Sequence, residues 1–289
     1  MSTASTSASK ATPELIFFEG QPAVHLRAPG GAEATVLLHG GQVLSWIPAG
    51  GQERLYLSER AVYAEGKAVR GGVPVIFPQF EKRGPLPRHG FARDRRWKLL
   101  RAETGADDAM AVLGLSDDEA TRAIWPHAFS VGRTVNVGAR RVGLELEVYN
   151  PGTAPFSFNA ALHTYLRVNE VEEARLTGLR GLTHADSTEG GREHLDSNGT
   201  LRVEGEVDRI YFDAPGALRL SEPQRELGIE LQQFPDVVVW NPWEEKCAAL
   251  ADMPPLGFRR MLCVEAAAIG TPISLAPGED WWGRQTLYA

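Results

Sequence analysis

Two titratable side chains, those of His163 and Glu265, lie in runs of apolar and small residues. All the other residues from 261 to 268 are apolar, and burying a carboxylate among them is costly unless the group is paired or used. Such surroundings raise the pKa of a carboxyl group, as a general base that works near neutral pH requires. An imidazole can exchange protons in the same pH range. His163 and Glu265 are therefore candidate catalytic residues.

Both residues also have ordinary structural explanations. A histidine beside a packed strand is more often a satisfied core residue, and Glu265 could lie at a strand end with its carboxylate in solvent. Asp208 and Trp240 are weaker candidates for a sugar site. The carboxylate of Asp208 could accept hydrogen bonds from sugar hydroxyls, and the flat ring of Trp240 suits the CH groups of a sugar. A strand end and core packing explain these two residues equally well.

A third candidate site is the segment 70–93, here called the arginine segment, which reads RGGVPVIFPQFEKRGPLPRHGFAR. Its glycines and prolines prevent a long regular element. Its basic and titratable residues are Arg70, Arg83, Arg88, His89 and Arg93. Guanidinium groups can bind an anion through two hydrogen bonds, so the segment could be the wall of a binding site. The alternative is a surface loop with solvated charges.

The composition excludes several classes of protein. The chain has 289 residues, 43% of them hydrophobic and 23% charged, as in ordinary globular proteins. Its formal net charge of -7 argues against general nucleic-acid binding, which requires a basic surface. The two cysteines, Cys247 and Cys263, form no CxxC pattern, and the histidines show no HExxH-type spacing. With no dinucleotide, phosphate-loop or serine-hydrolase motif either, we expect no metal and no cofactor.

The N-terminal residues 1–13 are rich in Ser, Thr and Ala and lack the apolar core of a secretory signal. No apolar run approaches the roughly 18 residues that span a bilayer. We therefore expect residues 1–13 to form a flexible leader. Residues 14–289 show no compositional break and are expected to form one domain, in a cytoplasmic monomer that binds neither membrane nor nucleic acid.

Apolar residues recur mostly at period two, in short runs between turn-forming residues, which is typical of half-buried strands. The clearest run is 141–149, where Val142, Leu144, Leu146 and Val148 share one face. Further strands are predicted within 35–46, 201–207, 227–231, 236–240 and 261–268. Helical periodicity is confined to 58–65 and 170–175. The pattern predicts an all-β protein with two packed sheets.

Seven segments of the chain resemble the hexose-6-phosphate mutarotases, also called glucose-6-phosphate 1-epimerases, of the aldose 1-epimerase superfamily. They span most of the chain in the order found in that family. The segments are LHGGQVLSW (38–46), AVRGGVPVIFPQF (68–80), HGFAR (89–93), NAALHTYLRV (159–168), EVDRIY (206–211), VVVWNPW (237–243) and MLCVEAA (261–267). The resemblance implies the galactose-mutarotase-like fold, a large antiparallel β supersandwich, in agreement with the strand pattern.

The resemblance also implies an activity, the exchange of the α and β anomers of a sugar phosphate. By that resemblance His163 is the general acid, Glu265 the general base, and Asp208 a ligand of sugar hydroxyls. Anomer exchange requires a proton to leave the C1 hydroxyl while another reaches the ring oxygen. An acid and a base must therefore flank one carbon atom, and neither a metal nor a cofactor is needed.

The arginine segment gains specific roles from the same resemblance. Arg70 and Arg93 match arginines that hold the substrate, and their charge suits a phosphate group. His89 matches a histidine that is expected beside the reacting sugar ring. Arg88 stands where relatives often carry glutamine, so it could either contact the phosphate or lie outside the pocket. Arg83 has no match beyond its charge.

Three hypotheses follow from these residues. The chain is an epimerase of glucose 6-phosphate or a close hexose phosphate, a mutarotase of unphosphorylated aldoses, or a sugar-binding protein without turnover. Convergence of Arg70 and Arg93 on one pocket would favour the first, and their divergence into solvent the second. The presence of both His163 and Glu265 disfavours the third, because binding alone requires no acid and base.

Overall fold

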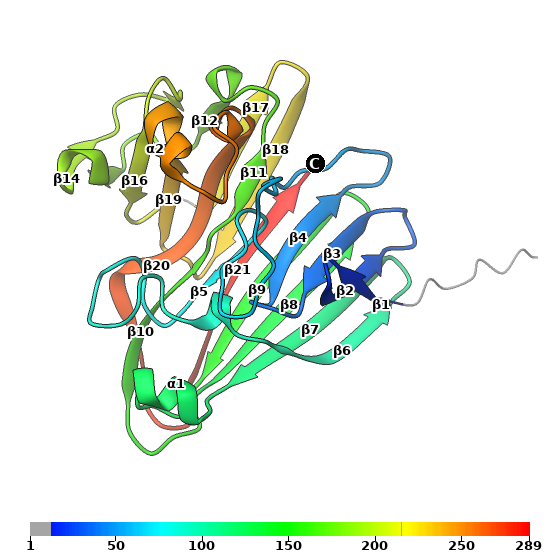
Figure 1. Ribbon diagram of the computed structural model, residues 1–289. Helices are drawn as coiled ribbons and strands as arrows, with labels where there is room; N and C mark the ends of the chain where they lie inside the picture. Colours follow the sequence, from blue (N-terminus) through cyan, green and yellow to red (C-terminus); the bar gives the residue numbers. More distant parts are fainter. Residues whose placement is uncertain (1–12, 215) are drawn as a thin grey trace, which may run out of the picture.

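The computed structural model describes residues 13–214 and 216–289, so the predicted leader 1–13 lies almost wholly outside the described residues. The described chain consists mainly of antiparallel strands with few helices (Figure 1), and the prediction of an all-β fold is confirmed. The strands form sheets of nine, eight and four strands. In the described part of the chain, no helix is long and apolar enough to cross a membrane.

The nine-stranded sheet has the order β15-β12-β17-β18-β21-β9-β8-β7-β6. The alternation predicted for 141–149 is confirmed, because β9 covers that range and its four apolar residues are fully buried. The strands of this sheet are β6 (Lys98–Thr104), β7 (Asp108–Ser116), β8 (Ser130–Gly138), β9 (Arg141–Tyr149), β12 (Arg175–Thr177), β15 (Thr200–Leu201), β17 (Ala217–Glu222), β18 (Arg225–Gln232) and β21 (Asp280–Tyr288).

The eight-stranded sheet has the order β14-β13-β16-β19-β20-β10-β5, and β11 also pairs with β20. Its strands are β5 (Val75–Ile76), β10 (Phe156–Leu162), β11 (Tyr165–Arg167), β13 (Thr183–Asp186), β14 (Arg192–Leu195), β16 (Val207–Tyr211), β19 (Asp236–Asn241) and β20 (Met261–Leu275). The 15-residue β20 bends along the molecule and has β19, β10 and β11 as neighbours (Figure 1).

The four-stranded sheet has the order β1-β2-β3-β4, with β1 (Glu14–Phe18), β2 (Gln21–Arg27), β3 (Glu33–Leu37) and β4 (Gln42–Ile47). Buried residues of all three sheets belong to one continuous apolar cluster. Examples are Trp46 on β4, Leu144 on β9 and Val264 on β20, each at most 1% exposed. This shared core gives the sheets fixed relative positions, since close-packed interiors tolerate little displacement.

Three sequence predictions of local structure differ from the structure. The range 201–207 is not a strand, because β15 ends at Leu201 and β16 begins at Val207. Leu201, Val203 and Val207 are nevertheless buried, so their alternation reports burial from an irregular segment. The range 58–65 contains no helix, and 170–175 contains only the short 3-10 helix η2 (Val171–Glu173).

The other helices are short and were not predicted. They are α1 (Glu119–Ile124), α2 (Trp243–Ala249) and the 3-10 helices η1 (Ala92–Asp94), η3 (Ser187–Glu189) and η4 (Gly257–Arg260). Helix α1 begins with a capping box in which the Asp118 carboxylate accepts a hydrogen bond from the Thr121 backbone N–H at 2.7 Å. In six or seven residues an apolar periodicity cannot repeat, so these helices leave little trace in the sequence.

Candidate active site

Strand register brings His163 and Glu265 together. His163 lies in the short gap between β10 and β11, which both pair with β20. The pairs on either side of the gap keep one register, and they are Leu162 with Ala266 and Tyr165 with Cys263. That register places His163 opposite Glu265. Side chains of such cross-strand neighbours begin roughly 5 Å apart, so two residues distant in the sequence meet on one face of the sheet.

The same face carries further polar and aromatic side chains. Asp208 pairs with Trp240 across β16 and β19, and Val238, two residues before Trp240, pairs with Glu265. Because residues two apart in a strand share a face, these side chains all point the same way. They line a cavity of about 560 Å³. All the predicted site residues line this cavity, namely Arg70, Arg88, His89, Arg93, His163, Asp208, Trp240 and Glu265.

The His163 and Glu265 side chains are in direct contact. The distance from His163 Nδ1 to Glu265 Oε1 is 3.2 Å, and Glu265 is 1% exposed. The contact is not aligned as a hydrogen bond, and His163 Nδ1 and Glu265 Oε2 have no hydrogen-bond partner within the described residues. Buried polar atoms without partners are rare, and their presence beside a cavity is typical of a functional site.

Burial opposes charge on both members of the pair. It raises the pKa of Glu265 well above its usual range, the Asp208 carboxylate adds to this effect, and Arg93 opposes it. Burial also lowers the pKa of His163, as do the basic side chains around it. Both shifts favour the uncharged form of the pair, in which the carboxyl group carries the proton and the imidazole is neutral.

The backbone around Arg70 is fixed by a buried side chain and a glycine. Gln42, which is fully buried, donates hydrogen bonds to the carbonyl oxygens of Val69 at 3.1 Å and Gly71 at 2.6 Å. Gly71 has φ +113°, and a Cβ there would collide with the Tyr56 carbonyl oxygen. Only glycine accepts both conditions, so the sequence RGG holds Arg70 at the cavity wall.

The Arg70 guanidinium already has two partners in the protein. Its Nε lies 3.2 Å from each carboxylate oxygen of Asp252, and its Nη1 donates to Tyr165 Oη at 2.9 Å. Part of the charge predicted to meet an anion is thus balanced by Asp252. The remaining N–H groups of Nη1 and Nη2 are the donors that a ligand could use.

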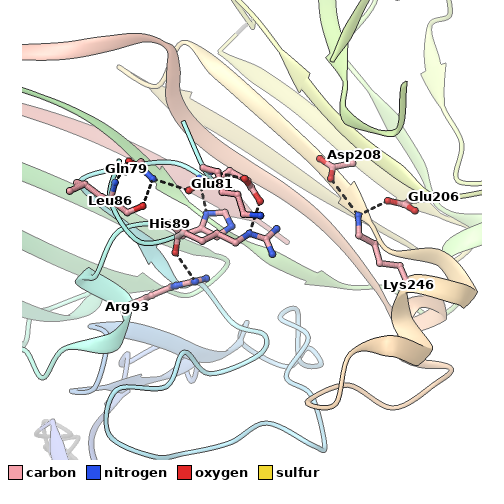
Figure 2. A network of polar contacts seen from close by, with 10 residues as sticks. Gln79, Glu81, Leu86, His89, Arg93, Glu206, Asp208 and Lys246 are labelled. Carbon is pink, nitrogen blue, oxygen red and sulfur yellow. Dashed lines mark hydrogen bonds and ion pairs between the residues drawn. The ribbon is translucent and has the colours of Figure 1, made fainter. Parts of the chain in front are cut away.

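The loop 81–89, within the arginine segment, is closed at its neck and filled from inside (Figure 2). At the neck, His89 N donates to Glu81 O at 3.0 Å, and Glu81 N donates to His89 Nδ1 at 3.3 Å. Both residues have positive φ, 65° and 47° respectively. Inside the loop, Gln79 Nε2 donates to Glu81 O and Leu86 O, and Leu86 N donates to Gln79 Oε1 at 2.9 Å.

This loop presents a neutral imidazole to the cavity. Burial, with the charges of Arg93 and Arg88, lowers the pKa of His89 to about 3. Because Nδ1 accepts a backbone hydrogen bond, the proton of the neutral ring is on Nε2. The ring lies edge-on to that of His163, with centroids 5.9 Å apart. His89 is therefore a hydrogen-bond donor beside the His163 and Glu265 pair.

The other arginines of the segment differ in burial. Arg93 Nη2 donates to Arg88 O at 3.1 Å, while Arg93 Nε is buried with no hydrogen-bond partner in the described chain. Its nearest carboxylate, that of Asp94, is 3.9 Å away. Arg88, 60% exposed, pairs with Glu81 at 2.6 Å. Arg93 is thus half-buried in the wall, as Arg70 is, and Arg88 lies at its rim with Arg83.

Comparison with known proteins identifies the family. The family model for aldose 1-epimerase matches residues 22–288. The chain belongs to the aldose 1-epimerase family. It is 36% identical over 280 residues to a protein of Cenchrus ciliaris, covering 93% of this chain and 85% of that one, and 32% identical over 242 residues to a protein of Escherichia coli K12, covering 81% and 79%. Both are named "Putative glucose-6-phosphate 1-epimerase".

Solved structures of this aldose 1-epimerase family agree with the fold. A crystal structure described as a putative mutarotase, from Salmonella typhimurium, superposes with a TM-score of 0.89 at 27% identity, covering 96% of this chain and 93% of that one. Galactose 1-epimerase from Lactobacillus acidophilus has a TM-score of 0.73 at 15% identity, covering 97% and 98%, and shares the fold. The predicted galactose-mutarotase-like fold is confirmed, and the family makes the chain an isomerase.

On the side of the cavity away from the loop 81–89, Lys246 faces two carboxylates (Figure 2). Lys246, on α2, lies 2.7 Å from Glu206 Oε1 and 3.9 Å from Asp208 Oδ2. Burial raises the pKa of Asp208, and Lys246 opposes the rise. Asp208 can accept hydrogen bonds at the cavity wall, as a ligand of sugar hydroxyls must.

Sequence reasoning missed three residues at this site, Tyr165, Lys246 and Asp252. Tyr165 could have been found, because it follows His163 by two positions and must share its face of the sheet. Lys246 and Asp252 belong to α2 and the loop after it, where no local pattern indicates which tertiary partner each will meet.

Cys263 lies beneath the pair, on the same face of β20 as Glu265. The described residues contain one group of three potential metal ligands whose ligand atoms lie within 4.8 Å of one another, formed by His163, Cys263 and Glu265. Burial raises the pKa of the Cys263 thiol well above its usual range, which keeps it protonated and a weak ligand. The other two residues of the group are the predicted acid and base.

Proposed function

We propose that the chain interconverts the α and β anomers of glucose 6-phosphate, or of a closely related hexose 6-phosphate. One observation carries the proposal: Arg70 and Arg93 line the same cavity as the His163 and Glu265 pair. The nearest carboxylate to the half-buried Arg93 guanidinium is 3.9 Å away, and a cation whose charge is so weakly balanced favours an anion at this wall. The names of the relatives in Cenchrus ciliaris and Escherichia coli support the same substrate class.

In the proposed reaction Glu265 takes the proton of the C1 hydroxyl while His163 protonates the ring oxygen. The ring opens to the free aldehyde, the C1–C2 bond rotates, and the same pair works in reverse to close the ring on the other face. The pair needs one proton in total, since the neutral pair and the ion pair hold the same number. The pKa shifts favour the neutral pair at rest, so in this account the proton passes from Glu265 to His163, 3.2 Å away, before the sugar ring opens.

The remaining wall residues position the sugar in this account. Asp208 accepts hydrogen bonds from ring hydroxyls, His89 donates one from Nε2, and Trp240 packs against the CH groups of the ring. Arg93 and the free N–H groups of Arg70 bind the phosphate. The exposed basic residues at the rim attract the anion without holding it, because solvent screens them.

A second candidate is a mutarotase of unphosphorylated aldoses. It is favoured by the pairing of several cavity cations with carboxylates: Arg70 with Asp252, Arg88 with Glu81, and Lys246 with Glu206. These pairs lower the net charge of the wall. Arg93 is the exception, because its nearest carboxylate is 3.9 Å away. The two candidates therefore differ in what Arg93 binds.

Exchange NMR at anomeric equilibrium separates the candidates. The protein is added to glucose 6-phosphate and, in a parallel sample, to glucose, and the rate of α to β exchange is measured above the spontaneous rate. We expect the phosphorylated sugar to exchange roughly 10 to 100 times faster, which corresponds to one or two charged hydrogen bonds. Equal rates would overturn the phosphate assignment, and no acceleration with any hexose or hexose phosphate would overturn the reaction.

We also propose that residues 14–289 act as one unit, in a monomer, because buried residues of all three sheets share one core. A phosphorylated substrate carries charge and does not cross a bilayer unaided, which favours a cytoplasmic location.

A further inference from the structure

We propose that Asp252 and Tyr165 are positioning residues that hold the His163 ring in its working orientation through Arg70. An unbroken series of contacts runs from Asp252 through Arg70 and Tyr165 to His163. Both Asp252 carboxylate oxygens lie 3.2 Å from Arg70 Nε, and Arg70 Nη1 donates to Tyr165 Oη at 2.9 Å. The Tyr165 ring then stacks on that of His163, with centroids 4.7 Å apart and planes 9° from parallel. The proposal rests on the role given to His163 in the proposed function.

The stacked ring of Tyr165 cannot turn freely. Tyr165 is 2% exposed, and Trp240 packs edge-on against both Tyr165, at 6.1 Å, and His163, at 6.0 Å. The hydroxyl group at the far end of the Tyr165 ring is fixed by Arg70. One face of the His163 imidazole therefore lies against the Tyr165 ring, which Trp240 contacts from the side and Arg70 holds by its hydroxyl group. Catalytic groups lose rate when such support is loose, by up to about a hundredfold for a misplacement of 1 Å.

The Asp252 and Arg70 pair differs from a surface ion pair. Exposed pairs contribute little, typically up to about 1 kcal/mol. Here the side chains are 28% and 24% exposed, and the arginine is committed to a second partner, Tyr165. Removing the Asp252 charge leaves the Arg70 guanidinium without its counter-ion at the cavity wall. We expect the guanidinium to remain at the cavity wall with its charge no longer balanced, and to hold the Tyr165 hydroxyl less firmly.

The charge of Asp252 also reaches His163 through Arg70. The groups that surround His163 are Arg70 and Arg93, His89, Tyr165 on β11, Glu265 and Cys263 on β20, and Trp240 on β19, with Asp208 beyond Glu265. Arg70 is one of the cations that lower the pKa of His163, after burial and His89. Loss of the Asp252 charge strengthens the effect of Arg70, so the pKa of His163 falls further. A purely structural role for Asp252 would not move it.

The test uses the full chain with Asp252→Asn, Tyr165→Phe and the control Glu33→Gln. Glu33 pairs with Arg27 at 2.9 Å, is 32% exposed, and lies on the four-stranded sheet away from the cavity. For each variant, kcat and KM for anomer exchange are measured against pH with glucose 6-phosphate and with glucose, and thermal unfolding is recorded. The His163 imidazole is titrated by ¹⁵N NMR, its signals being assigned by their loss in His163→Gln.

We expect Asp252→Asn to lower kcat about tenfold for both sugars and to move the His163 titration to lower pH, with Asp252→Glu restoring part of each. Tyr165→Phe keeps the stack and loses the hydrogen bond, so its kcat falls by a smaller factor. Glu33→Gln should change neither kcat nor the His163 titration. An unchanged His163 titration with unchanged kcat in the first two variants would overturn the proposal, as would a rise confined to the KM of glucose 6-phosphate. The NMR titration needs no turnover, so it tests the positioning even if the proposed reaction is refuted.

Discussion

The two walls of the cavity are built by different means. His163 and Glu265 stand opposite each other because β10 and β11 pair with β20 in one register, and the ladder continues on both sides. The arginine segment has no such ladder over 81–89, and buried amide side chains such as Gln79 hold it from inside. Moving a sheet residue would disturb the core, whereas the loop can change without that cost.

This difference suggests a division of labour. In our account the sheet wall, which carries His163 and Glu265, fixes the reaction, because an acid and a base in register can open and close any aldose ring. The loop wall, which is formed by the arginine segment 70–93, fixes which sugar is used, because its cations meet the part of the substrate that does not react. Arg88 lies at the exposed rim of that wall, where it pairs with Glu81. Variants in the two walls should therefore fail in different ways.

The largest effect is expected in the sheet wall. Glu265→Gln keeps the shape of the side chain and removes its ability to accept a proton, so anomer exchange should fall by roughly 10² to 10⁴ with both sugars. Exchange NMR measures the rate, and line broadening of the sugar phosphate shows that it still binds. Full activity of this variant, or a loss limited to the phosphorylated sugar, would contradict the division of labour.

His89 of the loop wall and Glu265 of the sheet wall should make contributions to stability that change with pH in opposite directions. Unfolded histidine takes up a proton near pH 6.5, but folded His89 does so only near pH 3. Between these values the unfolded state binds more protons, so stability is lost as the pH falls, by roughly 1.4 kcal/mol per unit well inside the window. Glu265 has a raised folded pKa, so its contribution is present at low pH and is lost as the pH rises above about 4.5.

Urea unfolding at several pH values measures this contrast. Asparagine tolerates the positive φ of position 89. In His89→Asn the slope of stability against pH between pH 6.5 and 3 should therefore fall by the contribution of about one proton. Glu265→Gln should instead flatten the loss at higher pH. A His89→Asn variant whose pH dependence matches that of the unaltered protein would mean that the loop histidine is not buried in its neutral form.

The smallest effect is expected for Gln79→Ala. The substitution removes three hydrogen bonds that fill the loop 81–89, so the loop should loosen and the KM for glucose 6-phosphate should rise a few-fold, while exchange of glucose is unchanged. Hydrogen exchange of the loop amides reports the loosening. An equal loss of rate for both sugars would show that the loop also supports the acid and base.

The sequence predicted the elements that repeat a pattern over enough residues. Strand β9 was found because its apolar residues alternate over nine positions, whereas α1 and α2 are too short for a helical period. The segment 201–207 alternates and is buried, yet it lacks the ladder of hydrogen bonds that makes a strand. Periodicity therefore indicates burial, and pairing must come from the rest of the fold.

The site was partly predictable for the same reason. Charged residues in apolar surroundings, such as His163 and Glu265, are costly to bury and so can be recognised from the sequence alone. Asp252 sits in an ordinary polar loop, and only the fold brings it to Arg70, 182 positions away. Contacts that depend on such distant segments carry no local signal, which is why the support behind His163 was missed.

The most direct test of the account is the ratio of exchange rates for glucose 6-phosphate and glucose, measured side by side in the unaltered protein and in Arg93→Gln. Arg93 is the half-buried cation of the loop wall whose nearest carboxylate is 3.9 Å away, while the predicted acid and base stand on the sheet wall. We predict a ratio of roughly 10 to 100 that falls toward one in the variant, with the rate for glucose unchanged. An unchanged ratio, or an equal fall in both rates, would contradict the separation of reaction and specificity between the two walls.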